Sequence, residues 1–121
     1  MKKLFWLLIA SSVFVLSCRE EPEPTTLKIF PQHHGAPIYG ATAYIEFNTQ
    51  SSAGALSNYD LVVHGDPAKD YIQVSPFNNG NYFVLCVGYD PSISDSVLGG
   101  IPFVVPAGHE GEFTIQVPVT E

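Results

Sequence analysis

Four histidines, His33, His34, His64 and His109, raise the question of metal binding. Three carboxylates lie near them in sequence, namely Asp66, Asp70 and Glu110. Metal-binding pairs often follow spacings such as H-x-H, H-x3-H or H-E-x-x-H, and the sequence contains none of these. Adjacent His33 and His34 would also point to opposite faces of an extended strand. We therefore predict no metal ligand, with a site formed by His33 or His34 together with His109 as the alternative.

An acidic segment, Asp90–Asp95 with the sequence DPSISD, is a second place where a cation could bind. Carboxylate and hydroxyl oxygens are ligands that Ca²⁺ prefers, but the segment does not match the D-x-D-x-D-G pattern of a calcium loop. Aspartates also cap turns by accepting hydrogen bonds from nearby backbone N–H groups. We predict a solvated loop in which aspartates cap the turns, and calcium binding is the alternative.

Nucleophilic catalysis has little support in this sequence. The serines of the acidic loop, Ser92, Ser94 and Ser96, stand in no recognisable Ser-His-Asp order. Cys86 lies in the apolar run Tyr82–Val87, where a free cysteine usually behaves as a small buried hydrophobic residue. A reactive thiol needs a nearby positive charge, and none lies close in sequence. We predict that the chain is not an enzyme and needs no cofactor.

The N-terminal segment has the order of a secretory signal. Lys2 and Lys3 are followed by the apolar stretch Leu4–Leu16 and then by the small residue Ser17. As a helix, the apolar stretch would span about 20 Å of a hydrocarbon layer that is about 30 Å thick. It is therefore too short to be a comfortable transmembrane helix, and a cleaved signal peptide over residues 1–17 is predicted.

Cys18 gives this signal a more specific interpretation. Val15–Cys18 (VLSC) resembles the lipobox of bacterial lipoproteins, which implies that Cys18 becomes acylated and anchors the protein in a membrane. Residues 18–25 then form an acidic, proline-containing tether without fixed structure. Within it, Glu20 and Glu21 resemble the surface-export signal of Bacteroidota-type lipoproteins, which implies display on the outer membrane. The alternative is a solvated spacer on a protein that faces the periplasm.

Acidic residues dominate the mature chain. Without Lys2 and Lys3, three basic residues remain beside twelve acidic ones, which gives a net charge of −9. Neutralising phosphates requires clustered lysine or arginine, so this charge argues against nucleic-acid binding. The same charge disfavours attraction to anionic lipid, so the acyl chains on Cys18 are left as the membrane attachment.

Residues 26–121 are enough for one domain and too few for two. Short β-branched and aromatic segments alternate there with Gly, Pro, Asn and Asp, and no amphipathic helical periodicity occurs. Seven strands are predicted: Thr26–Phe30, Ala41–Asn48, Tyr59–His64, Tyr71–Ser75, Tyr82–Tyr89, Ile101–Val105 and Glu112–Val117. This pattern predicts an all-β fold, a single seven-stranded antiparallel β-sandwich.

Two of these strands carry additional expectations. Tyr82–Tyr89 is the most hydrophobic strand and should be central, whereas the prolines beside Ile101–Val105 predict an edge strand. Tyr82–Val87 is apolar on both of its faces, so its outer face must be covered or meet a partner. We expect the neighbouring segment Val97–Val105 to provide that cover.

Three landmarks occur in an order that resembles the carboxypeptidase regulatory-like and transthyretin-like (prealbumin-like) β-sandwiches. They are the turn Gly35–Ala41 (GAPIYGA), Phe77 followed by Gly80–Tyr82 (GNY), and Gly88-Tyr89. The resemblance covers about residues 27–119 and implies a prealbumin-like or Ig-like sandwich. Transthyretin-like folds include hydroxyisourate hydrolase, whose family carries a core arginine and a C-terminal Tyr-Arg-Gly-Ser. This domain has neither feature, so that activity is not expected.

These features together predict a small binding or assembly module in a larger envelope complex. Such a module would recognise a protein through its loops or a strand edge. The alternatives are an adhesin or pilus-type accessory subunit and a glycan-binding accessory lipoprotein of a nutrient-uptake system. An exposed row of Tyr39, Tyr44 and Tyr59 would favour a glycan, and an unpaired edge beside Ile101–Val105 would favour strand addition.

Overall fold

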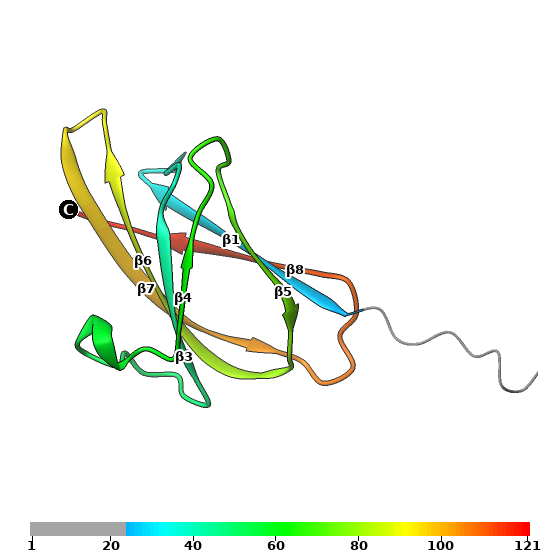
Figure 1. The fold of residues 1–121 in the computed structure, drawn as a ribbon. Coiled ribbons are helices and arrows are strands. Elements are labelled where there is room, and N and C mark those ends of the chain that lie inside the picture. Colours follow the sequence, from blue (N-terminus) through cyan, green and yellow to red (C-terminus); the bar gives the residue numbers. More distant parts are fainter. Residues whose placement is uncertain (1–23) are drawn as a thin grey trace, which may run out of the picture.

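The computed structural model describes residues 24–121, which form an all-β fold of two four-stranded sheets (Figure 1). The predicted signal peptide, the acylated Cys18 and the export signal at Glu20 and Glu21 lie outside the described residues. Within residues 24–121, no helix is long and apolar enough to cross a membrane.

The strands are divided between the sheets as follows. The first sheet contains β1 (Thr25–His33), β2 (Ala36–Pro37), β5 (Ile72–Phe77) and β8 (Glu112–Pro118). The second sheet contains β3 (Thr42–Phe47), β4 (Leu61–His64), β6 (Gly80–Asp90) and β7 (Asp95–Val105). A single 3-10 turn, η1 (Leu56–Asn58), lies between β3 and β4.

The all-β prediction is confirmed, but the strand number and the purely antiparallel pairing are wrong. Eight strands form, because the two residues of β2 pair with the end of β1 after a two-residue turn at His34 and Gly35. A segment this short carries no hydrophobic pattern that could have predicted it. β8 pairs with β1 in parallel. After β7 the chain crosses from the second sheet to the first, and β8 then runs in the same direction as β1.

The second sheet has the strand order β4-β3-β6-β7. Both predictions about its strands are confirmed, since β6 lies between β3 and β7 and β7 lies at the end of the order. β7 begins at Asp95 rather than Ile101, because the hairpin with β6 stays in register from Asp90 and Asp95 to its open end.

Pro31 does not end the first strand, as the sequence had predicted, and β1 continues to His33. The carbonyl of Pro31 accepts a 3.0 Å hydrogen bond from the N–H of Ile38. The backbone of Pro31 therefore faces the edge of β1 that pairs first with β5 and then with β2, and Pro31 lies in the gap between these two strands. Proline has no N–H to donate, and at this gap no ladder hydrogen bond is lost. The ring is buried instead.

The core lies between the two sheets, and alternate residues of the long strands fill it. Its fully buried large side chains are Leu27, Ile29, Pro31, Ile45, Val84, Cys86, Val97, Val105 and Val117. At one end, the ring of Tyr82 packs 4.6 Å from Phe77 and 5.2 Å from Phe103, centroid to centroid. The Tyr82 hydroxyl donates a 2.8 Å hydrogen bond to the carbonyl of Asn78, so this buried tyrosine has the polar partner that it needs.

The chain enters the fold at Pro24, and Glu121 lies at the opposite end of the domain (Figure 1). His33, at the far end of β1 from Thr25, belongs to the same end as Glu121. Any site built there therefore lies at the opposite end of the domain from Thr25.

Candidate functional site

The turn between β1 and β2 brings the two adjacent histidines together. His34 and Gly35 both have positive φ, of 51° and 79°, which is the backbone of the tight two-residue turn that joins hairpin strands. Because His34 leaves the extended conformation, its ring packs against that of His33 with centroids 4.1 Å apart. The expectation that these side chains point to opposite faces is therefore wrong, since it assumed an extended strand.

Asp90, at the end of β6, holds the ring of His33. The His33 side chain is 3% exposed, and its Nδ1 lies 2.7 Å from Asp90 Oδ2. The other carboxylate oxygen, Asp90 Oδ1, accepts hydrogen bonds from the N–H and hydroxyl of Ser92, at 2.9 and 2.6 Å. The hydrogen bonds from Ser92 and His33 lower the pKa of Asp90 to about 2. Asp90 is thus a carboxylate that accepts a hydrogen bond from the Nδ1–H of His33, and this bond does not involve Nε2.

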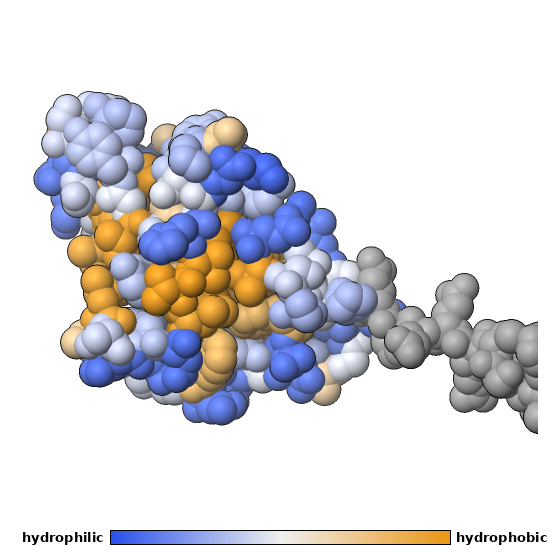
Figure 2. Space-filling view, in the orientation of Figure 1, coloured by the Kyte–Doolittle hydropathy of each residue, from blue (hydrophilic) through white to orange (hydrophobic). Residues whose placement is uncertain are grey.

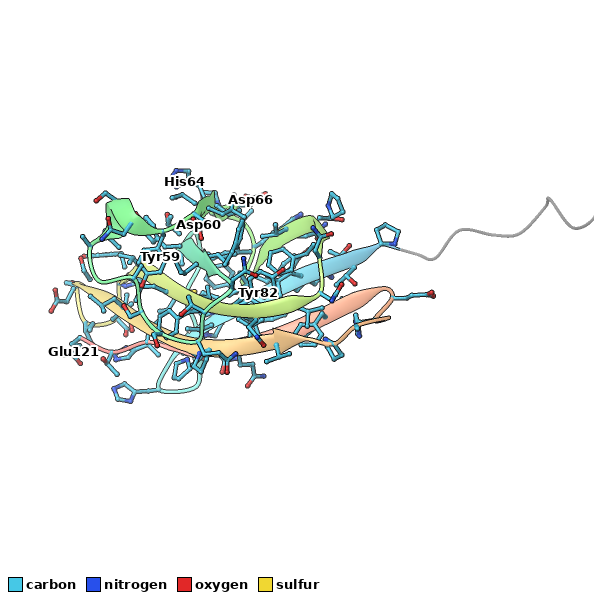
Figure 3. The ribbon with its side chains drawn as sticks, turned by 90° about the horizontal axis from the view of Figure 1, so that it is seen from below. Tyr59, Asp60, His64, Asp66, Tyr82 and Glu121 are labelled. Carbon is cyan, nitrogen blue, oxygen red and sulfur yellow. The ribbon has the colours of Figure 1, made fainter. Side chains whose placement is uncertain are left out.

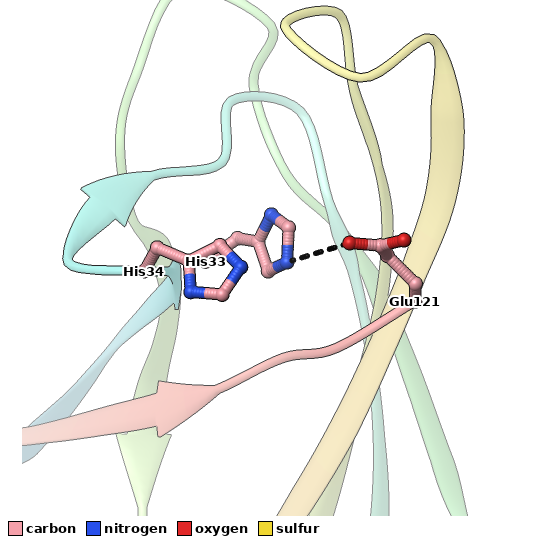
Figure 4. Close-up of side chains that lie close together, drawn as sticks. All are labelled: His33, His34 and Glu121. Carbon is pink, nitrogen blue, oxygen red and sulfur yellow. Dashed lines mark ion pairs between the residues drawn. The ribbon is translucent and has the colours of Figure 1, made fainter.

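The free nitrogen of His33 faces a second carboxylate. His33 Nε2 lies 3.8 Å from Glu121 Oε1 (Figure 4). One ligand atom from each of His33, His34 and Glu121 can be chosen so that all three lie within 4.8 Å of one another. In the part of the chain that the structure describes, this is the only group of three or more such residues that could hold a metal ion.

The other predicted ligands do not join this cluster. His109 lies at the opposite end of β1, where its carbonyl accepts a hydrogen bond from Thr25 Oγ1. A site that combines His33 or His34 with His109 is therefore excluded by the length of β1, about 25 Å. His64 bonds to Thr42 Oγ1 at 3.1 Å and lines a shallow cleft with Asp66, on the far side of the domain from Glu121 (Figure 3). Sequence reasoning missed Glu121, because only tertiary contact brings it near the β1–β2 turn.

The acidic loop is organised by its own hydrogen bonds. Asp90 and Asp95 face one another across the β6–β7 hairpin. Asp90 Oδ1 caps the turn through Ser92, and Asp95 Oδ1 accepts a 2.8 Å bond from the N–H of Ser96. Cys86 belongs to the core, as predicted, and burial raises the pKa of its thiol to about 12.

A second feature is the outer face of the second sheet, which is apolar. Tyr44, Leu85 and Val62 occupy neighbouring positions on β3, β6 and β4, and Val87 is the partner of Leu98 on β7. Val62, Leu98 and Val104 are 43%, 53% and 48% exposed. In Figure 2, apolar side chains gather over the middle of the view and continue to the left, where Figure 1 places β6 and β7.

The expected cover for this face is absent from residues 24–121. β7 pairs with β6 along its whole length and is therefore its neighbour in the same layer. A strand in the same sheet extends the outer face and cannot lie over it, so the prediction of an intramolecular cover by Val97–Val105 is wrong. The Phe83 ring is partly shielded, because it lies against Gly100 of β7.

Two carboxyl groups border the apolar face, Glu46 on β3 and Asp60 just before β4. Asp60 Oδ2 accepts a 2.8 Å hydrogen bond from the N–H of Phe47. Glu46 Oε2 is buried and has no hydrogen-bond partner among residues 24–121. Removal from water, and then the neighbouring charge of Asp60, raise the pKa of Glu46 above its ordinary value.

We expect Glu46→Gln to raise the Tm at pH 7 and to change it less at pH 4. A carboxyl with a higher pKa in the folded state binds its proton more strongly there, so stability falls as the pH rises above the unfolded-state pKa. Glutamine loses no proton and avoids this decrease. Thermal unfolding at both pH values measures the effect, with Glu110→Gln as an exposed control for net charge. An equal change in Tm at both pH values would contradict the prediction.

The three tyrosines proposed for glycan stacking do not form an exposed row. Tyr59 is buried and packs 6.0 Å from Tyr44, centroid to centroid. Tyr39 is exposed but lies in the β2–β3 connection, where it lines a cleft with Tyr89. The exposed row of tyrosines that would have favoured glycan binding is therefore not formed.

Comparison with known proteins finds similarity among solved structures. No protein-family model and no curated protein matches the chain. Among solved structures, the chain is similar to a DUF4876 family protein from Bacteroides thetaiotaomicron, with 16% sequence identity and a TM-score of 0.44. The similarity covers 81% of this chain and 24% of that protein, so the chain spans about a quarter of its length. The fold itself defines a small all-β domain built from two sheets.

Proposed function

We propose that this protein is a non-enzymatic binding or assembly module, held at the outer membrane by acyl chains on Cys18. The observation that carries the proposal is the apolar outer face of the second sheet. Leu98 and Val104 are each about half exposed there, and Leu98 lies opposite the partly exposed Val87. Contiguous apolar surface on a soluble domain is typical of a protein interaction site.

The charge of the domain indicates what kind of partner would fit. The only basic residues after the tether are Lys28 and Lys69, so a second copy of the chain would bring two strongly acidic domains together. Glu46 and Asp60 place two carboxyl groups beside the apolar residues. The partner is therefore a protein surface that combines apolar side chains with at least one lysine or arginine, which would pair with these acidic groups.

The face, rather than the edge, is the recognition surface in this proposal. Leu98 exchanges two 2.8 Å backbone hydrogen bonds with Thr120, so its N–H and C=O groups point away from β6. Every second residue of β7 from Leu98 onward directs its backbone groups to the same side. One of these residues is Pro102, which has no N–H for an added strand. Proline on an edge protects it against strand addition, and the free edge beside Ile101–Val105 is blunted in this way.

The tether orients the module in this proposal. Residues 18–25 would hold the domain by its Thr25 end, so both sheets extend away from the membrane. Glu20 and Glu21 would direct the lipoprotein to the cell surface, and a periplasm-facing protein is the alternative.

Photo-crosslinking in intact cells tests the proposal. A photoreactive residue at Leu85 is expected to give a defined adduct, and one at Gln73, on the outer side of the first sheet, is expected to give none. Binding of the identified partner, measured with both purified proteins, should weaken at least tenfold in Leu85→Asp, and Gln116→Asp should leave it unchanged. Adducts between two copies of the chain, or equal adducts from both positions, would refute the proposed partner.

A further inference from the structure

The structure assigns a Zn²⁺ site to His33, His34 and Glu121, at the end of the domain opposite Thr25. This inference is independent of the proposed protein-binding face, because none of the three residues belongs to that face. Two imidazoles and one carboxylate are a ligand set that Zn²⁺ accepts, with a fourth position left for water or another ligand. Imidazole nitrogen also favours zinc over Mg²⁺ and Ca²⁺, which prefer oxygen ligands.

The distances are close to what zinc needs. Tetrahedral coordination with bonds of about 2.0–2.1 Å places neighbouring ligand atoms about 3.3 Å apart. His33 Nε2 and Glu121 Oε1 are 3.8 Å apart, and all three ligand atoms lie within 4.8 Å of one another. His34 and Glu121 are exposed, so their side chains can close the remaining distance by rotation.

Hydrogen-bonded backbone lies beside the three ligands. His34 is fixed by the tight turn that joins β1 and β2. Glu121 follows Thr120, which is bonded to Leu98, and Val119, whose N–H donates to the carbonyl of Gln32 at 2.9 Å. The backbone on both sides of the site is therefore tied to the same two sheets.

Asp90 supplies the second, independent observation. It is a positioning residue that accepts a hydrogen bond from the Nδ1–H of the buried His33, and this bond orients the ring so that Nε2 faces Glu121. Histidines that bind metals commonly donate their other N–H to a carboxylate in this way. Ser92 in turn donates two hydrogen bonds to Asp90 and orients it. A solvated histidine would not require this buried support.

Calorimetric titration of the full-length lipoprotein in detergent micelles with ZnCl₂ tests the assignment. We expect one Zn²⁺ per chain and a higher Tm in excess zinc, because a ligand that binds only the folded state stabilises it. His34→Ala and Glu121→Gln change exposed side chains and should each weaken zinc binding at least tenfold. His64→Ala and His109→Ala remove histidines outside the site and should bind zinc like the native protein.

Asp90→Asn distinguishes a positioning role from a structural one. Its zinc affinity is measured at a temperature at which the zinc-free variant is still folded, and it should fall about 10–100-fold. The absence of saturable binding to the native protein would overturn the assignment. Binding that is insensitive to His34→Ala and Glu121→Gln, or equally sensitive to His64→Ala, would overturn it as well.

Discussion

The Cys18→Ala variant is expected to leave the membrane fraction almost completely, whereas the native protein remains there. Each buried methylene contributes about 0.8 kcal/mol to membrane association, so losing the acyl chains removes the attachment. The domain offers no electrostatic replacement, because Lys28 and Lys69 are its only basic residues. Fractionation of cells that express each form, with detection of the protein in both fractions, measures the change.

Cys86→Ala is the matched control for this variant. It removes a thiol that is fully buried in β6 and keeps Cys18, so the protein should stay in the membrane fraction. Protease added to intact cells extends the experiment to the export signal. The native protein should be digested, and a variant with both Glu20→Ala and Glu21→Ala should be protected until lysis. Membrane-bound Cys18→Ala would refute the anchor, and a protected native protein would refute surface display.

Gly99→Ala should lower the Tm by more than about 10 °C, because it separates the two sheets where they meet. A Cβ at this position would collide with the carbonyl group of Pro118 and the Cα of Val119, which are backbone atoms that cannot rotate away. The neighbouring residue Leu98 makes the backbone hydrogen bonds to Thr120 that join β7 to the end of β8. Overpacking typically costs about 1–3 kcal/mol, and a rigid backbone places this site at the upper limit. Each kcal/mol lowers the Tm of a domain of this size by about 4–8 °C.

Gly108→Ala is the control for the loss of a glycine. A Cβ there meets no atom within 4 Å, and only the positive φ of 79° opposes the change. That strain costs about 1–2 kcal/mol, so the decrease in Tm should be clearly smaller than for Gly99→Ala. Thermal unfolding of both variants under the same conditions makes the comparison. Equal Tm values would show that the close contact between β7 and β8 does not stabilise the fold.

Strand positions could largely be predicted from local patterns, because a strand that packs one face on a core repeats every two residues. Ala43 and Ile45 in β3 and Ile115 and Val117 in β8 are buried at alternate positions, as this period requires. The turn residues Gly35 and Gly40 have the positive φ that the landmark turn requires. Strand pairing could not be derived in the same way, since the parallel contact of β1 with β8 depends on the path between distant segments.

The apolar face and the histidine cluster differ in how far the sequence could predict them. The apolar face could be suspected from Tyr82–Val87, whose residues are apolar on both faces of the strand. Whether β7 covered that face could not be predicted, because it depended on whether β7 pairs with β6 in the same sheet. The histidine cluster could not be found from spacing, because it needs the left-handed backbone of His34 and the approach of Glu121. The sequence predicts Asp90 as a residue that caps a turn, and its contact with His33 arises only when β1 and β6 pack together.

The sequence by itself determined the all-β class, the acidic charge and the prediction of a lipid anchor at Cys18, because these depend on composition and on local order along the chain. The tertiary structure alone decided that β7 lies beside β6, that Pro31 lies within β1, and that His33, His34, Asp90 and Glu121 meet. Such contacts depend on register and on long-range packing, which join residues whose local sequences carry no information about one another.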